Sequence, residues 1–202
     1  MDKKRGVEAL PIKNNLIRIC GLCLLLLPAA VQAQEYDKRW YMGGYGGWIA
    51  LDSARHSHDD TMVGGGFGRF WGQRWSVDIE FESYNTHYDQ EYLESRGRYG
   101  WNGQNRVKDL QFVGRYYFRE SGFRPYVSFG AGLQRHRNSF DDGGSPTALA
   151  GLGAHYMFGN YVGARIQAYY KTAFGNDTHP ETNTLSDIIY RLDLLVYFGK
   201  PR

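Results

Sequence analysis

Three carboxylates occur at alternate positions in the segment Trp75–Tyr84 (WSVDIEFESY), and they are the first residues that could do chemistry. Asp78, Glu80 and Glu82 share one parity, whereas the tryptophan, valine, isoleucine and phenylalanine of the segment share the other. Because side chains alternate between the two faces of a β-strand, one face is apolar and the opposite face is acidic. In a soluble sandwich the acids would face water. If the apolar face contacts lipid instead, the acids face an interior where each needs a cationic partner.

Later segments place cations and further acids at alternate positions in the same way. The predicted interior charge network consists of Asp78, Glu80, Glu82, Asp109, Arg115, His155, Arg165, Lys171, Arg191 and Asp193. Two interpretations stay open for this network. It is either a saturated set of ion pairs that plugs the interior, or a gate that rearranges to pass small ions. Glycines at the interior positions 43, 47, 151 and 153 leave room for bulky neighbours or for water.

The N-terminal segment has the three parts of a secretory signal peptide. A basic stretch is followed by the apolar run Ile19–Leu27 and then by small residues before and at Ala33. This order predicts cleavage after Ala33, so residues 1–33 form the signal peptide and residues 34–202 form one exported domain. Both cysteines lie within the apolar run, so the mature chain is expected to contain no disulfide.

Export changes the charge balance of the chain. The signal peptide holds five of the 24 lysines and arginines and two of the 21 acidic residues, which leaves 19 of each in the mature chain. A formally neutral chain gives no reason to expect nucleic acid as a partner. The apolar run is too short for a transmembrane helix, and 26 glycines with 16% aromatic residues fit a β-rich domain.

Eight segments of roughly 10–12 residues show strand-like alternation, which is near the length of a tilted strand that crosses a bilayer. The predicted strands cover residues 40–51, 61–71, 75–84, 109–118, 125–134, 148–158, 162–171 and 187–198. No segment shows sustained helical periodicity.

The connections between these segments alternate in length. Long polar joins at residues 52–60, 85–105, 137–146 and 172–186 alternate with short turns, as in an outer-membrane barrel with its long loops outside the cell. Aromatic residues crowd the strand ends, as interface girdles require: Trp40, Tyr41, Trp71, Trp75, Tyr116, Phe118, Tyr170 and Phe198. The predicted fold is an all-β, eight-stranded antiparallel up-and-down transmembrane β-barrel. A secreted soluble sandwich, with its usually shorter strands, is the alternative.

Four stretches together resemble the OmpA-like transmembrane domain family of small eight-stranded barrels. They are KRWYMGGYGGW, VGGGFGRFWGQRWSVDIEFESY, FRPYVSFGAGLQ and GLGAHYMFGNYVGARIQAYY, and their order and spacing carry the resemblance. The resemblance implies a monomer without a cofactor in the outer membrane of a Gram-negative bacterium, surrounded by outer-membrane lipids and lipopolysaccharide. It also implies contact with the barrel-assembly machinery during insertion, with Phe198 as the aromatic residue that the machinery reads.

Three functions are compatible with such a barrel. The first is a structural, membrane-integrity role with external loops that contact a surface ligand, and the loop at residues 88–99 mixes both charges with tyrosines. The second is a narrow pore for ions or small solutes, and the third is an enzyme that modifies lipid A.

Neither catalysis nor metal binding is expected. The end of the seventh predicted strand lacks the His-x-Ser-Asn pattern of the lipid A deacylases, and acyl chemistry needs a base aligned on a nucleophile. The remaining candidates are Ser83 with His87, and His179 with Asp177, Thr178, Glu181 and Ser186. The sequence His56-Ser57-His58-Asp59-Asp60 could supply metal ligands, but a solvated loop explains it as well.

Overall fold

The computed structural model describes residues 38–52, 57, 60–87, 94–95, 97, 104–137, 142–174 and 184–199. The predicted signal peptide lies outside these residues. Among the described residues, no helix is both long and apolar enough to cross a membrane.

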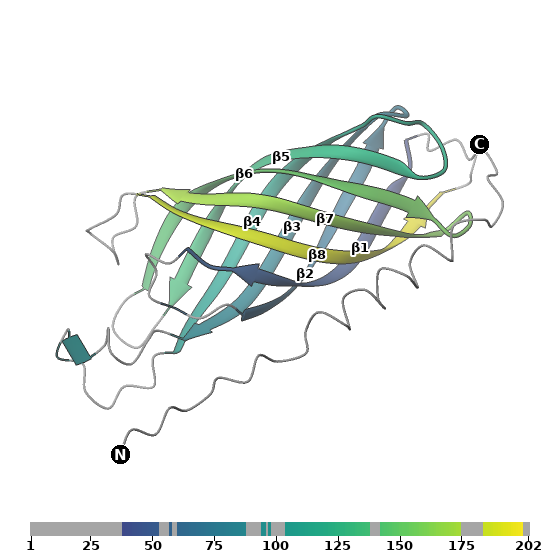
Figure 1. Ribbon diagram of the computed structural model, residues 1–202. Coiled ribbons are helices and arrows are strands. Elements are labelled where there is room, and N and C mark those ends of the chain that lie inside the picture. Colours follow the sequence, from purple (N-terminus) through teal and green to yellow (C-terminus); the bar gives the residue numbers. More distant parts are fainter. Residues whose placement is uncertain are drawn as a thin grey trace, which may run out of the picture. The chain divides into compact units, whose positions relative to one another are not determined.

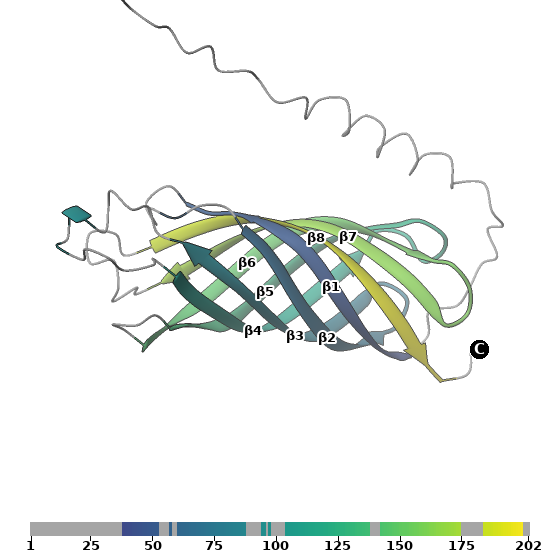
Figure 2. The same ribbon diagram turned by 90° about the horizontal axis from the view of Figure 1, so that it is seen from below.

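Eight antiparallel strands form one closed barrel, in which each strand pairs with its neighbours in the sequence and the last pairs with the first (Figure 1). The strands are β1 (Trp40–Ala50), β2 (Asp60–Trp71), β3 (Trp75–His87), β4 (Gln104–Tyr117), β5 (Arg124–Arg137), β6 (Asp142–Met157), β7 (Val162–Phe174) and β8 (Thr184–Phe198). The short turns after β2, β4 and β6 lie at the same end of the barrel as the start of β1 and the end of β8 (Figure 2). The predicted up-and-down barrel is confirmed.

Burial alternates along the strands with the polarity reversed relative to a soluble protein. In β8, for example, Leu192 and Leu194 are 55% and 61% exposed, whereas Arg191 and Asp193 between and beside them are buried. An apolar outer surface and a polar interior fit a barrel whose outside contacts lipid. The alternation therefore sorts charges into the interior, where the candidate site lies.

Every strand except β1 is longer at the loop end than alternation of polarity predicts, and the lengths run from 11 residues in β1 to 16 in β6. β5 and β6 pair up to Arg137 and Asp142, so most of the predicted loop at residues 137–146 is strand. β3 and β4 also extend into the predicted loop at residues 85–105, since they pair up to His87 and Gln104. Beyond the bilayer both faces of a strand can be polar, so the ladder continues after the hydrophobic alternation has ended.

Tyr41 was expected in the aromatic girdle, and this expectation is wrong. Its side chain is 1% exposed and lies in the interior, where the hydroxyl donates a hydrogen bond to Asp78 Oδ2 at 2.9 Å. The neighbouring Trp40, which has the opposite parity, is 44% exposed on the outer surface. Parity along β1, rather than position at its end, decides which of the two residues reaches the membrane interface.

Interior glycines accommodate bulky side chains from the neighbouring strands. A Cβ atom at Gly47 would lie 2.8 Å from the Cβ of Arg191, and one at Gly153 would lie 2.6 Å from the hydroxyl oxygen of Tyr126. These separations are shorter than carbon and oxygen atoms tolerate. Of the two possibilities that the sequence left open, bulky neighbours rather than water account for these positions.

Replacing Gly47 by alanine should therefore destabilise the barrel by about 1–3 kcal/mol, because the new methyl group forces Arg191 and the adjoining backbone aside. Gly46→Ala is the matched control, since its Cβ would face outward with its nearest neighbour, the carbonyl oxygen of Met62, at 3.8 Å. Urea unfolding in detergent, followed by the heat-dependent gel shift, measures both. Equal stability of the two variants would contradict the close approach at Gly47.

Candidate functional site: the interior ion-pair network

The candidate site is a set of charged side chains that four strands direct into the barrel. The acids and cations are Asp78, Glu80 and Glu82 on β3, Asp109 and Arg115 on β4, Arg165 and Lys171 on β7, and Arg191 and Asp193 on β8. Each is at most 3% exposed. Such charges are costly to bury unless they are paired and hydrogen-bonded, so the contacts among them determine what the site can do.

The part of the network nearest the short turns centres on Asp78 and Glu80. Arg115 Nη1 contacts Asp78 Oδ2, and its other terminal nitrogen lies 2.6 Å from Glu80 Oε1. Arg165 reaches both Asp78, at 3.4 Å, and Asp193, where its Nε is 3.0 Å from Oδ2. Two arginines from opposite walls of the barrel thus share the β3 carboxylates, and the interaction spans the interior.

Arg191 links this part to the rest of the network. Its Nη2 lies 2.7 Å from Glu80 Oε1, and its Nη1 lies 3.4 Å from Glu82 Oε1. Its Nε is also 3.0 Å from Asp193 Oδ1, and the guanidinium carbon lies 3.9 Å from the centre of the Tyr45 ring. A cation that touches three carboxylates and an aromatic face is held in one position.

Glu82 and Asp109 form the part nearest the long loops. They are directly opposite each other in the β3–β4 register, an arrangement in which like charges repel. Lys171 Nζ compensates both, at 3.3 Å from Glu82 Oε2 and 2.8 Å from Asp109 Oδ2. Glu82 also accepts hydrogen bonds from Gln111 Nε2, at 3.2 Å, and from the Tyr169 hydroxyl. The pair of acids is therefore stable only with the β7 lysine in place.

Two clusters of apolar and aromatic side chains pack against the network. The inner cluster, toward the short turns, contains Tyr41, Phe70, Tyr117, Tyr126, Met157, Leu195 and Tyr197. The outer cluster contains Tyr45, Ile49, Met62, Tyr84, Val107, Val113, Leu149, Tyr169 and Ile189. Part of it lies among the ion pairs, since Val113 is opposite Asp78 and Tyr45 is opposite Asp193 in the strand registers. Ion pairs among apolar and aromatic side chains are shielded from water, which strengthens their mutual attraction.

Nine of the ten residues predicted for the network are joined by ion pairs, and the tenth, His155, is directly opposite Arg165 in the β6–β7 register. His155 is fully buried, with Nε2 2.7 Å from the Tyr197 hydroxyl oxygen and its ring 5.9 Å from that of Tyr117. It therefore lies where the network meets the inner cluster.

The sequence prediction missed the hydroxyl groups that complete the network. Tyr41 donates to Asp78, Tyr169 donates to Glu82, and Tyr126 donates to Gln167 Oε1 at 2.8 Å. Alternation relative to the outward tryptophans of β1 could have identified Tyr41. Tyr169 could have been identified as an interior residue, because it has the same parity as Arg165 and Lys171 on the same strand.

The loop candidates for catalysis and metal binding fall mostly outside the described residues. His56, His58, Asp59 and the segments 88–93 and 175–183 are not described. Within the part of the chain that is described, no group of three or more histidine, cysteine, aspartate or glutamate residues could hold a metal ion.

The closed barrel with an apolar outer surface and a paired polar interior defines an outer-membrane β-barrel protein. The family model for the outer membrane protein beta-barrel domain matches residues 20–186, so the chain belongs to this family. The protein is therefore located in the outer membrane of a Gram-negative bacterium. No curated protein sequence matches the chain.

Two solved outer-membrane proteins share the fold at low sequence identity. Neisserial surface protein A superposes with a TM-score of 0.61 and 11% identity, covering 84% of this chain and 100% of that one. The outer membrane protein OprG from Pseudomonas aeruginosa gives a TM-score of 0.51 and 16% identity, covering 83% of this chain and 99% of that one. At such identities the similarity concerns the fold alone.

Replacing Arg165 by alanine should destabilise the barrel by roughly 3–5 kcal/mol, because Asp78 and Asp193 would each lose a cationic partner in a buried setting. Arg74→Ala is the matched control. Arg74 pairs with Glu120 at 2.8 Å in the exposed turn region, with both side chains about half exposed, so its loss should change the stability of the barrel far less. Unfolding in urea measures the difference, and a loss of stability no greater for Arg165→Ala than for Arg74→Ala would be inconsistent with the buried pairs.

Proposed function

We propose that this protein has a structural, membrane-integrity role, as a rigid barrel that does not conduct and that presents its loops at the cell surface. The observation that carries the proposal is the pairing of the cations and carboxylates of the network with one another. Each of the four cations lies within ion-pair distance of at least two of the five carboxylates. Charges that are engaged in this way stiffen the barrel and are not available to a passing solute.

A pore would require these contacts to open. The interior of an eight-stranded barrel is only wide enough for side chains to fill it, and here two clusters of apolar and aromatic side chains pack against the ion pairs. Passage of an ion would have to displace Arg191 from Glu80, Glu82 and Asp193 together. Removing one partner of a buried pair costs several kcal/mol, which supports a closed interior.

The same ion pairs speak against catalysis in the interior. A general acid or base must be free to exchange a proton with a substrate, whereas Glu80 and Glu82 are fixed by arginine, lysine and tyrosine side chains. The proposal therefore assigns the protein no enzymatic activity, and it assigns any surface ligand to the external loops.

Single-channel recording tests the closed interior directly. The mature chain, refolded and shown by a heat-dependent gel shift to be folded, should give no discrete openings in a planar bilayer. Arg191→Ala should increase the current across the bilayer or make it fluctuate. The reason is that this substitution removes the side chain that joins both halves of the network. Reproducible openings of the unaltered protein would favour the narrow pore.

A deletion strain tests the membrane-integrity role. Loss of the protein should increase sensitivity to detergent with a chelator and to large antibiotics that an intact outer membrane excludes. A variant with intact folding and truncated external loops should restore resistance if the barrel itself is required. A pore predicts the opposite phenotype, since its loss would slow the uptake of small hydrophilic solutes and leave the barrier unchanged.

A further inference from the structure

Four buried oxygen atoms on the inward faces of β4, β5 and β6 have no hydrogen-bond partner among the described residues. They are Asp109 Oδ1, Gln111 Oε1, Gln134 Oε1 and Ser145 Oγ. Each of these side chains is at most 2% exposed. We call the four residues the outer oxygen cluster. A buried polar atom without a partner is costly, so a group of such atoms points to a ligand that completes their interactions.

The strand registers bring these side chains together. Asp109 is directly opposite Gln134, and Gln134 is directly opposite Ser145, so the three form one row across β4, β5 and β6. Side chains that are directly opposite each other have Cβ atoms about 4.5–5.5 Å apart. Gln111 is the next inward residue after Asp109 on β4. Oxygens from three strands therefore border one part of the interior.

The other polar atoms of the cluster are already engaged in the network, and these contacts orient the remaining oxygens. Gln111 Nε2 donates to Glu82 Oε2 at 3.2 Å, and a carboxylate only accepts, so Gln111 Oε1 is turned away from Glu82. Gln134 Nε2 donates to the Tyr84 hydroxyl at 2.8 Å. The contact of Lys171 with Asp109 is to Oδ2. What the cluster offers to a ligand is therefore a set of oxygen atoms.

The charge around the cluster favours a positively charged ligand. Lys171 Nζ lies 2.8 Å from Asp109 Oδ2 and 3.3 Å from Glu82 Oε2, and Asp187 is directly opposite Lys171 in the β7–β8 register. All three carboxylates are at most 1% exposed. Arg191 also reaches Glu82, at 3.4 Å, but it is shared with two other acids. Three carboxylates thus surround one lysine in this part of the interior.

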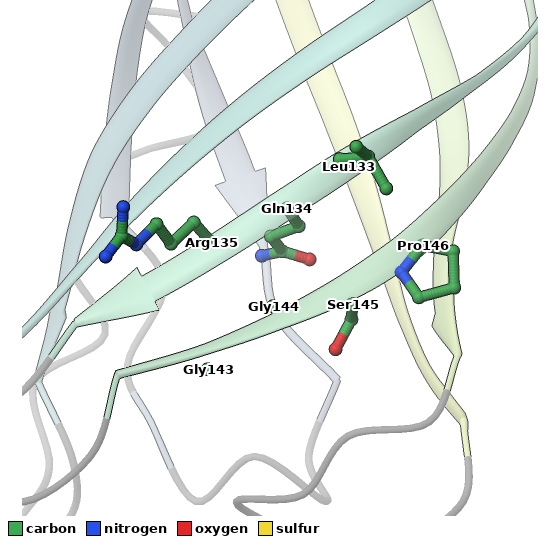
Figure 3. Close-up of a pocket in the computed structure, with 7 residues that line it drawn as sticks. All are labelled: Leu133, Gln134, Arg135, Gly143, Gly144, Ser145 and Pro146. Carbon is green, nitrogen blue, oxygen red and sulfur yellow. The ribbon is translucent and has the colours of Figure 1, made fainter.

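A hollow of about 480 Å³ at the loop end of β5 and β6 gives a ligand room beside the cluster (Figure 3). Gln134 and Ser145 line this hollow, and Gly143 and Gly144 line it without side chains that could fill it. Arg135 lines it too, but Arg135 is exposed on the outward face of β5, where water and salt screen its charge.

We propose that the outer oxygen cluster binds a hard metal cation, and that this cation is Ca²⁺. Calcium takes six to eight oxygen ligands from carboxylates, amide carbonyls, hydroxyls and water, without a strict geometry. The cluster supplies one carboxylate oxygen, two amide oxygens and one hydroxyl oxygen, and the hollow has room for water. Such a site needs no group of three histidine, cysteine or acidic side chains, because most of its ligands are neutral oxygens.

A bound cation would join three strands at the loop end of the barrel and offset the excess of acid around Lys171. The nearby ammonium group and the single carboxylate ligand limit the affinity, so we expect a dissociation constant on the order of 0.1–1 mM, as in extracellular calcium modules. This binding site goes beyond the membrane-integrity role and does not depend on it. A calcium measurement on the purified barrel can therefore fail while the deletion phenotype stands.

The test titrates the folded mature protein, in calcium-free nonionic detergent, with Tb³⁺, a luminescent substitute for Ca²⁺ that nearby aromatic rings sensitise. Tyr84, whose hydroxyl contacts Gln134, supplies such a ring. Excitation of the protein should give terbium luminescence, and Ca²⁺ should displace the probe. The double variant Gln134→Leu/Ser145→Ala keeps every charge and should bind at least roughly tenfold more weakly, as loss of groups around a metal does.

Ser128→Ala is the matched control. Ser128 is also an inward serine, it is 3% exposed, and its hydroxyl has no partner among the described residues, but it is directly opposite Arg115 rather than an acid. This variant should change binding by less than about twofold. Ser145→Ala alone, which keeps the contact of Gln134 with Tyr84, should weaken binding in the same direction as the double variant.

Unfolding in urea provides a second readout. Added CaCl₂ should raise the unfolding midpoint of the unaltered protein and of Ser128→Ala, because a ligand that binds only the folded state stabilises it. It should not raise the midpoint of the double variant. NaCl at the same ionic strength should have no such effect. Equal stabilisation by NaCl, or equal binding by a double variant that passes the gel-shift test for folding, would overturn the proposal.

Discussion

The structure depends on one constraint: a chain surrounded by lipid must satisfy every polar group within itself. The backbone meets this constraint by closing eight strands into a barrel without edges, so that each strand has two hydrogen-bonded neighbours. Closure at eight strands makes an interior too narrow for bulk water. Charged side chains that point inward must then find partners across that interior, and the ion-pair network follows from the barrel's width.

The network in turn restricts the register of the strands. A slip of one residue in β3 would turn Asp78, Glu80 and Glu82 toward lipid and direct the apolar row into the barrel, so a single error would reverse the whole strand. A slip of two residues keeps the parity but separates Glu80 from both Arg115 and Arg191. Buried ion pairs are weak evidence for stability in general. Their value here is that only one arrangement of the strands satisfies them all.

Alternation of side chains was enough to predict the number of strands, the orientation of most interior residues and nine members of the network. It could not predict which cation meets which acid, because Glu80 and Arg191 become neighbours only through the stagger of the closed barrel. It also could not predict that His155 contacts Tyr117 and Tyr197, since parity gives the direction of a side chain and not its partners. Tyr41 was wrongly expected at the membrane interface, because its position at a strand end was given more weight than its parity.

Charged residues on the two faces of β4 differ in burial and in pairing, although they lie only a few positions apart. Asp109 and Arg115 face inward and pair with Lys171, Asp78 and Glu80. Arg106 and Lys108 face outward, opposite Arg137 and Arg135 in the β4–β5 register, and all four side chains are exposed. Inward charges that pair with one another specify the arrangement of the strands. Outward charges at the loop end are under no such constraint, so the two faces of one strand serve different purposes: the interior face fixes the barrel, and the outer face meets its surroundings.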